Sequence, residues 1–107
     1  MPCPPIEELN LLHANICKAM GDPKRIQILY TLNQTPLHVS ALAEALEMPQ
    51  PTVSRHLAIL RERSLVEAQR DGAQVFYSLA APEIIEILDN MRRLLRDVLQ
   101  QQSQLVA

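Results

Sequence analysis

The sequence has few aromatic residues, few glycines and few cysteines. It contains one Phe, two Tyr and no Trp in 107 residues, with two Gly and two Cys. Without large rings the hydrophobic core has to be built from aliphatic side chains, which favours helices. Two glycines cannot supply a Gly-rich phosphate loop, and His13, His38 and His56 fall in separate predicted elements with no carboxylate pair nearby. We therefore expect no enzymatic activity.

Long apolar runs are absent as well. No stretch approaches the roughly 20 consecutive apolar residues that a membrane-spanning helix needs, and no signal peptide precedes the fold. We expect a cytoplasmic protein with no membrane partner. In that setting Cys3 and Cys17 are expected to be free thiols rather than a structural disulfide.

The chain also lacks a strong charge of either sign. Its formal net charge is -2, so no global basic field indicates nucleic acid, and the charge of a local surface has to decide. Between Gln50 and Gln74 four arginines stand against three carboxylates. Because this excess is small, DNA binding would depend on a dimer that presents two such faces, and on modest salt.

Two sets of apolar residues at helical spacing do stand out, separated by a break at Met48-Pro49. The first set is Val39, Leu42, Ala43 and Leu46, and the second is Val53, Leu57 and Leu60. Helices this short are unstable alone and must pack their apolar faces together. The spacing predicts a helix-turn-helix over residues 39–63.

The second of these helices has a polar outer face. Its amide, hydroxyl and guanidinium groups match the donors and acceptors of the DNA major groove. The candidate DNA-binding residues, including basic residues farther along the chain, are Gln50, Thr52, Ser54, Arg55, His56, Arg61, Arg63, Arg70 and Gln74. The alternative is that these residues form an ordinary solvated helix face. His56 is either a hydrogen-bonded packing residue or a phosphate contact.

The preceding part of the chain reads as an arm and two helices. Three prolines in residues 1–5 predict a flexible arm, and apolar spacing predicts an amphipathic helix from Ile6 to about Met20. Asp22-Pro23 is the expected start of the next helix, followed by a loop over residues 33–36. The positions expected to be buried in that helix are Ile26, Ile28, Leu29 and Leu32.

The part after the helix-turn-helix reads as a hairpin and a long helix. Asp71-Gly72 between two β-prone runs predicts a two-stranded wing over residues 65–79. The last helix, predicted over residues 81–102, has a wider apolar stripe than so small a core can cover, which predicts a dimer through the first and last helices. The expected architecture is a single domain over residues 1–107, a winged helix-turn-helix that is mainly α (α+β) with the order ααααββα.

Three segments in this order and spacing resemble the ArsR/SmtB family of winged-helix repressors. They are residues 18–29, which contain Gly21-Asp22-Pro23, residues 53–61, and the wing with Arg70-Asp71-Gly72 followed by residues 75–79. The resemblance implies a homodimer that occupies a double-stranded operator overlapping a promoter. It also implies that the dimer leaves this operator when an inducer binds.

The sequence departs from that family in three places. Many members carry Cys-X-Cys as a metal site where this chain has His38-Val39-Ser40, and others carry Asp and His ligands on the last helix, which here has no His. The Arg often found after the wing glycine is Ala73. The first two differences argue against both common metal sites, and the third weakens a phosphate contact from the wing.

The two cysteines are the candidate inducer site. Cys17 follows His13 by one helical turn, which makes a soft-metal pair geometrically feasible, although a cysteine beside an apolar face is commonly just a small buried hydrophobe. Our hypothesis is that Cys3 and Cys17 form the inducer site, with His13 as a further candidate metal ligand. They would act either as thiolate ligands for a soft metal or metalloid ion such as arsenite, or as a disulfide or persulfide pair.

Two functions from different classes fit these observations. The first is a dimeric transcriptional repressor, and the second is a winged-helix module that contacts only proteins or effectors without binding DNA. Basic residues gathered around the second helix of the motif and the wing favour DNA.

Overall fold

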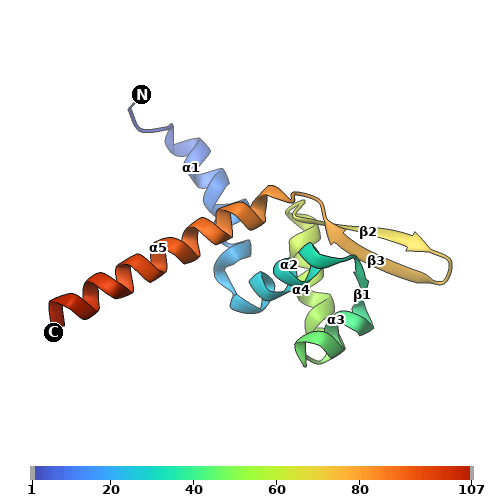
Figure 1. Cartoon of the computed structure of the whole chain (residues 1–107). Helices are drawn as coiled ribbons and strands as arrows, with labels where there is room; N and C mark the ends of the chain where they lie inside the picture. The colour runs from blue at the N-terminus through green and yellow to red at the C-terminus, as the bar shows by residue number, and fades with distance from the viewer. Residues whose placement is uncertain (1, 107) are drawn as a thin grey trace.

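The computed structural model describes residues 2–106, with side chains up to residue 103. Figure 1 shows a small body from which the first and last helices project on one side and a hairpin on the other. The α-helices are α1 (Ile6–Leu12), α2 (Pro23–Gln34), α3 (Val39–Leu46), α4 (Gln50–Glu62) and α5 (Glu83–Val106). The strands are β1 (Leu37–His38), β2 (Val66–Asp71) and β3 (Gln74–Leu79). The winged helix-turn-helix prediction is therefore confirmed, and none of the described helices is long and apolar enough to cross a membrane.

The prediction of one continuous helix from Ile6 to Met20 is wrong. After α1 the chain forms a π-helical turn, η1 (His13–Cys17), and then a 3-10 turn, η2 (Ala19–Gly21). The side-chain amide nitrogen of Asn15 donates to the Leu11 carbonyl at 2.8 Å. This bond competes with the backbone hydrogen bonds of the helix where the π-turn forms. Only Ala19 of this whole segment is buried. The apolar residues Ile6, Leu11 and Leu12 of α1 therefore remain exposed, and Leu9 is only partly covered.

Helix α2 begins as the sequence predicts. Pro23 occupies its first turn, and the Asp22 carboxylate accepts a hydrogen bond from the Lys24 amide at 2.8 Å. The helix runs to Gln34, so the predicted loop at residues 33–36 begins only at Thr35. Three of the four predicted positions are buried, whereas Ile26 is only partly covered.

The sheet has three strands instead of the two that were predicted. β2 and β3 form the expected hairpin, with Asp71 opposite Gln74 and a two-residue turn in which Gly72 has a φ of 64°. The short strand β1 adds to the other edge of β3, where Leu37 pairs with Tyr77. A strand of two residues is too short to show an alternating pattern, so β1 could not be predicted from the sequence.

The core is aliphatic, as the scarcity of aromatic residues predicts. Its members come from η2, α2, α3, α4, the start of β2 and the start of α5. They are Ala19, Ile28, Leu29, Leu32, Leu42, Val53, Leu57, Leu60, Leu65, Val66, Ile84 and Leu88. Three of them lie on α4, which fixes which face of that helix looks outward.

Helix α5 begins two residues later than predicted and extends to Val106. Its first turns pack on the body, where the Tyr30 hydroxyl donates to the Asp89 carboxylate at 2.6 Å and the Arg92 guanidinium lies 5.3 Å from the centre of the Tyr30 ring. Burial and this hydrogen bond raise the pKa of Tyr30. From Asn90 to Ser103 every residue is exposed, because the helix leaves the body (Figure 1).

Candidate nucleic-acid interface

Helix α4 has two sharply different faces. Val53, Leu57 and Leu60 are between 0% and 1% exposed, which holds the helix in one rotational position against the core. The side chains of Gln50, Ser54 and Arg55 are exposed, and we call these three residues the outer face of α4. A helix fixed by packing on one side and polar on the other can present side chains to a groove without loss of order.

The start of α4 has no hydrogen bond from a capping side chain. Pro51 lies in the first turn, and the Pro49 carbonyl accepts from the amides of Thr52 and Val53 at 3.0 and 3.2 Å. No side chain caps this end, so the positive end of the helix dipole faces solvent. Thr52 is partly covered, and its hydroxyl lies 3.5 Å from a nitrogen of the Arg55 guanidinium.

The wing brings Gln74 next to the start of α4. One hollow joins the beginnings of α3 and α4 to the start of β3, next to the wing turn, and it is lined by His38, Val39, Ser40, Gln50, Gln74 and Val75. A second hollow lies between α4 and β3, lined by Ser54, Leu57, Ala58, Arg61, Glu62 and Tyr77. The structure thus gathers the outer face of α4, Arg61 and Gln74 on adjoining surfaces. Arg70 lies one residue farther from the hairpin turn than Gln74, opposite Val75, and lines a different hollow with Asp71 and Phe76.

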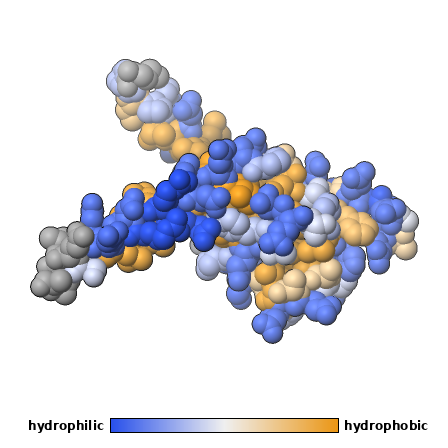
Figure 2. All heavy atoms as spheres, viewed as in Figure 1, coloured by the Kyte–Doolittle hydropathy of each residue, from blue (hydrophilic) through white to orange (hydrophobic). Residues whose placement is uncertain are grey.

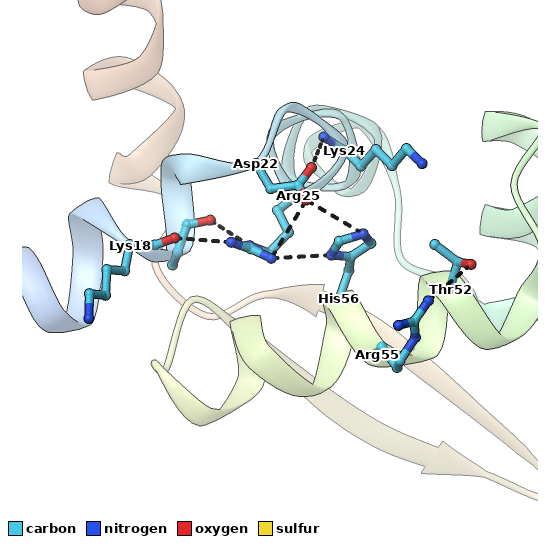
Figure 3. A network of polar contacts seen from close by, with 8 residues as sticks. Lys18, Asp22, Lys24, Arg25, Thr52, Arg55 and His56 are labelled. Carbon is cyan, nitrogen blue, oxygen red and sulfur yellow. Dashed lines mark hydrogen bonds and ion pairs between the residues drawn. The ribbon is translucent and has the colours of Figure 1, made fainter.

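His56 points away from this surface. Its side chain is 13% exposed and lies against the start of α2, with Nδ1 3.3 Å from an Arg25 guanidinium nitrogen and Nε2 4.0 Å from the Asp22 carboxylate (Figure 3). Burial lowers the pKa of His56; the Asp22 carboxylate opposes that shift, and the charge of Arg25 adds to it. Of the two interpretations of His56, the structure favours packing over phosphate contact.

Arg63 is also turned toward the N-terminal segment. Its guanidinium donates to the side-chain oxygen of Asn15 at 3.3 Å, and the residue is partly covered. Of the nine candidate DNA-binding residues, His56 and Arg63 therefore contact side chains outside α4, whereas Thr52 and Arg55 contact each other on the exposed side of the helix.

Sequence reasoning missed the polar residues at the start of α3. The His38 ring accepts from the Ala41 amide at 3.3 Å, lies 2.7 Å from the Ser40 hydroxyl and packs edge-on against Phe76 with ring centres 5.6 Å apart. This places His38 and Ser40 in the same hollow as Gln50 and Gln74. No local sequence signal predicts it, because the placement depends on the pairing of β1 with the wing.

The two cysteines are both exposed free thiols. The interpretation of Cys17 as a small buried hydrophobe is therefore wrong, since the residue ends η1 with its side chain exposed. His13 begins the same turn and is exposed too. Among the described residues, no group of three or more His, Cys, Asp or Glu side chains is arranged to hold a metal ion.

Comparison with known proteins agrees with this geometry. The family described as "Bacterial regulatory protein, arsR family" matches residues 22–68, which run from the start of α2 into β2. The chain is 37% identical over 79 residues to the transcriptional activator HlyU of Vibrio cholerae, covering 74% of this chain and 73% of HlyU. It is 36% identical over 87 residues to the HTH-type transcriptional repressor SmtB of Mycobacterium tuberculosis, covering 81% of this chain and 64% of SmtB.

Solved structures extend the agreement to the whole fold. The homodimeric winged helix-turn-helix DNA-binding domain of Mb0332 from Mycobacterium bovis superposes with a TM-score of 0.76 at 29% identity, covering 94% of this chain and 95% of that one. Reduced HlyU from Vibrio cholerae superposes with a TM-score of 0.71 at 34% identity, covering 83% and 94%.

Proposed function

The chain belongs to the ArsR/SmtB family of winged helix-turn-helix transcriptional regulators, and from this membership we propose that it is a homodimeric, sequence-specific DNA-binding repressor. The observation that carries the proposal is the outer face of α4. Its three polar side chains are exposed on a helix whose opposite face is completely buried. A recognition helix needs this combination to read base edges from a fixed position.

In the proposed complex α4 enters the major groove with its N-terminal half. Gln50, Ser54 and Arg55 contact base edges, and Thr52 supports Arg55 through the contact between their side chains. The exposed arginines Arg61 and Arg70 contact phosphates on either side, and Gln74 approaches the backbone from the wing. The positive end of the α4 dipole adds to phosphate attraction at the same place.

The apolar stripe of α5 supports a dimer. Six large hydrophobic residues of this helix are between 39% and 62% exposed: Ile87, Met91, Leu94, Leu95, Val98 and Leu99. On α1, Ile6, Leu11 and Leu12 are exposed by 47% to 64%. Figure 2 shows hydrophobic atoms along both projecting elements. A twofold-related copy would cover these surfaces and set two α4 helices about 34 Å apart, the separation of successive major grooves on one side of DNA.

DNA binding is tested with a duplex that the protein itself selects from a random-sequence pool. Fluorescence anisotropy of that duplex should give an affinity that falls steeply as salt rises, because arginines replace counterions on the phosphates. A duplex of scrambled sequence should bind more weakly. If no sequence is enriched and low salt produces no binding, the repressor proposal is wrong.

We further propose that Cys3 and Cys17 form the inducer site. Both thiols are exposed, and they lie on the N-terminal segment that also carries the exposed apolar residues of α1. The site would act either by thiolate binding of a soft metal or metalloid ion, with His13 as a candidate third ligand, or by oxidation of the two thiols. An inducer lowers operator affinity only to the extent that it prefers a dimer geometry in which both α4 helices cannot reach DNA.

The inducer proposal is tested on the selected duplex with and without reductant, zinc and arsenite. The wild type should lose affinity under one of these treatments, and the Cys3→Ser/Cys17→Ser double variant should keep it. His13→Asn tests the candidate third ligand, because it should weaken a metal response and leave a response to thiol oxidation unchanged. A double variant that still responds would dismiss these cysteines as the sensor. Nothing in the structure or the comparisons favours the alternative of a module that contacts proteins alone.

A further inference from the structure

Arg25 joins three parts of the chain that are distant in sequence. Its Nε donates to the Ala19 carbonyl at 2.7 Å and one terminal nitrogen donates to the Lys18 carbonyl at 3.0 Å. The other terminal nitrogen lies 3.3 Å from Nδ1 of His56 on α4, and the Asp22 carboxylate lies 4.0 Å from it (Figure 3). Every nitrogen of the guanidinium therefore has a partner, and the side chain is only 14% exposed.

The geometry fixes the tautomer of His56. A guanidinium can only donate, so Nδ1 of His56 must be the acceptor and the ring proton must sit on Nε2, which faces the Asp22 carboxylate. Lysine could not replace Arg25 here, because one ammonium cannot reach two carbonyls and the ring in this planar arrangement. The arrangement therefore holds α4 at a defined distance and rotation from residues 18–19.

A second arginine ties α4 to the same segment. Arg63 follows the end of α4 and donates to Asn15 at 3.3 Å, while His56 lies near the middle of the helix. Two attachment points on one helix fix its direction as well as its distance. The segment that they hold, residues 15–19, contains the exposed Cys17.

We propose that Arg25 is a positioning residue for DNA binding. It holds α4 in the orientation that presents the outer face, by linking His56 to the carbonyls of Lys18 and Ala19, and it does not itself touch DNA. This inference rests on the proposed function. It also means that a conformational change in residues 15–19, the segment around Cys17, is transmitted to the recognition helix through Arg25.

The test compares Arg25→Met with wild type on the duplex selected by the wild-type protein. Methionine keeps the aliphatic length and removes the guanidinium. The variant should bind this duplex roughly 2- to 30-fold more weakly, the range of mutations that disturb coupling without touching the ligand. The slope of log affinity against log salt should stay as in wild type, because no phosphate contact is lost. In ¹⁵N NMR spectra His56 should lose its strict Nε2–H tautomer.

Lys24→Met is the matched control, since it removes the same charge from the neighbouring, exposed position. It should leave both the affinity and the His56 tautomer close to those of wild type. The proposal is overturned if folded Arg25→Met binds as tightly as wild type. It is equally overturned if the salt slope falls by about one, because Arg25 would then be a phosphate contact.

If Arg25→Met does not fold, as judged by circular dichroism, variants of His56 test the same link. The amide oxygen of His56→Gln can still accept from Arg25, whereas His56→Leu has no acceptor. The Gln variant should bind the duplex more tightly than the Leu variant, and equal affinities would overturn the proposal. Failure of the proposed function looks different, because the wild type would then select no duplex at all.

Discussion

Arg55 and His56 are neighbours in the sequence and point to different sides of α4 (Figure 3). One helical step turns the side chain by about 100°, which carries Arg55 into solvent and His56 against α2. Two residues of similar chemistry therefore receive different roles. The exposed guanidinium is available for bases, and the imidazole is used inside the molecule.

We expect Arg55→Ala to weaken binding to the selected duplex by about 1–3 kcal/mol and to relax base preference at one position. The reason is that guanidinium pairs with the acceptor edge of guanine through two hydrogen bonds. Binding constants for the duplex and its single-base variants measure this. Arg55→Lys is the informative control, because it keeps the positive charge and loses the two parallel N–H donors of the guanidinium. If Arg55→Ala weakened binding equally for every single-base variant and Arg55→Lys restored the affinity, Arg55 would contact a phosphate instead of a base.

His56 predicts how stability depends on pH. Because burial lowers the pKa of His56 below its ordinary 6.5, the unfolded chain binds a proton near pH 6.5 that the folded chain takes up only at lower pH. The stabilising contribution is complete above pH 6.5 and is lost as the pH falls through that value toward the lowered pKa. Protonation would also place an N–H opposite the Arg25 donor.

Urea unfolding between pH 5 and 8, at fixed protein concentration, measures this effect. The free energy of unfolding of the wild type should decrease on acidification, and His56→Gln should flatten the curve. His13→Gln, at an exposed position, should leave the slope unchanged. An identical slope for wild type and His56→Gln would show that other groups cause any acid sensitivity.

The two helices of the helix-turn-helix end in the same way, without glycine. Glu47 after α3 and Ser64 after α4 have φ values of 52° and 62°, in the left-handed region. In each case the following amide donates back into the last turn, from Met48 to Ala43 at 3.0 Å and from Leu65 to Leu60 at 2.9 Å. These caps satisfy end carbonyls and turn the chain sharply, at the cost of a strained backbone in residues that have a Cβ.

We expect Ser64→Gly to stabilise the protein by about 0.5–1 kcal/mol, since glycine adopts this φ without a Cβ clash. Ser64→Ala is the control, because it retains the Cβ and should bring no gain. Thermal unfolding at one protein concentration compares the three proteins. If the Ala variant were stabilised as much as the Gly variant, relief of backbone strain would not be the cause.

The single chain is more extended than a compact domain of the same length. Its radius of gyration is 16.5 Å, whereas a compact chain of this length has about 13 Å. The excess comes from α1 and α5, which leave the body with their apolar residues uncovered (Figures 1 and 2). Apolar surface of this kind on a long helix is typical of an interface between subunits.

We expect Leu95→Glu to convert a wild-type dimer into monomers. Leu95 lies in the middle of the α5 stripe, and burial of one leucine contributes roughly 1.5–3 kcal/mol, which a twofold axis counts twice. Light scattering coupled to size-exclusion chromatography measures the mass, and DNA affinity should fall with it. Asn90→Glu introduces the same carboxylate on the polar side of α5 and should remain dimeric. If Leu95→Glu had the mass of a wild-type dimer, the interface would lie elsewhere.

Local patterns in the sequence determined the elements and their order. The spacing of Val53, Leu57 and Leu60, the Asp22-Pro23 start and the Asp71-Gly72 turn each act within a few residues, so the helix-turn-helix and the wing could be predicted without coordinates. The outer face of α4 followed from the same spacing, because burying one side of a helix defines the other.

Only the tertiary structure decided what depends on residues far apart in the chain. The pairing of β1 with β3 and the inward direction of His56 and Arg63 depend on partners brought close by folding. A pattern along the sequence shows which residues a helix exposes. The pattern cannot show that the guanidinium of Arg25 on α2 contacts His56 on α4, because that contact depends on how the two helices pack.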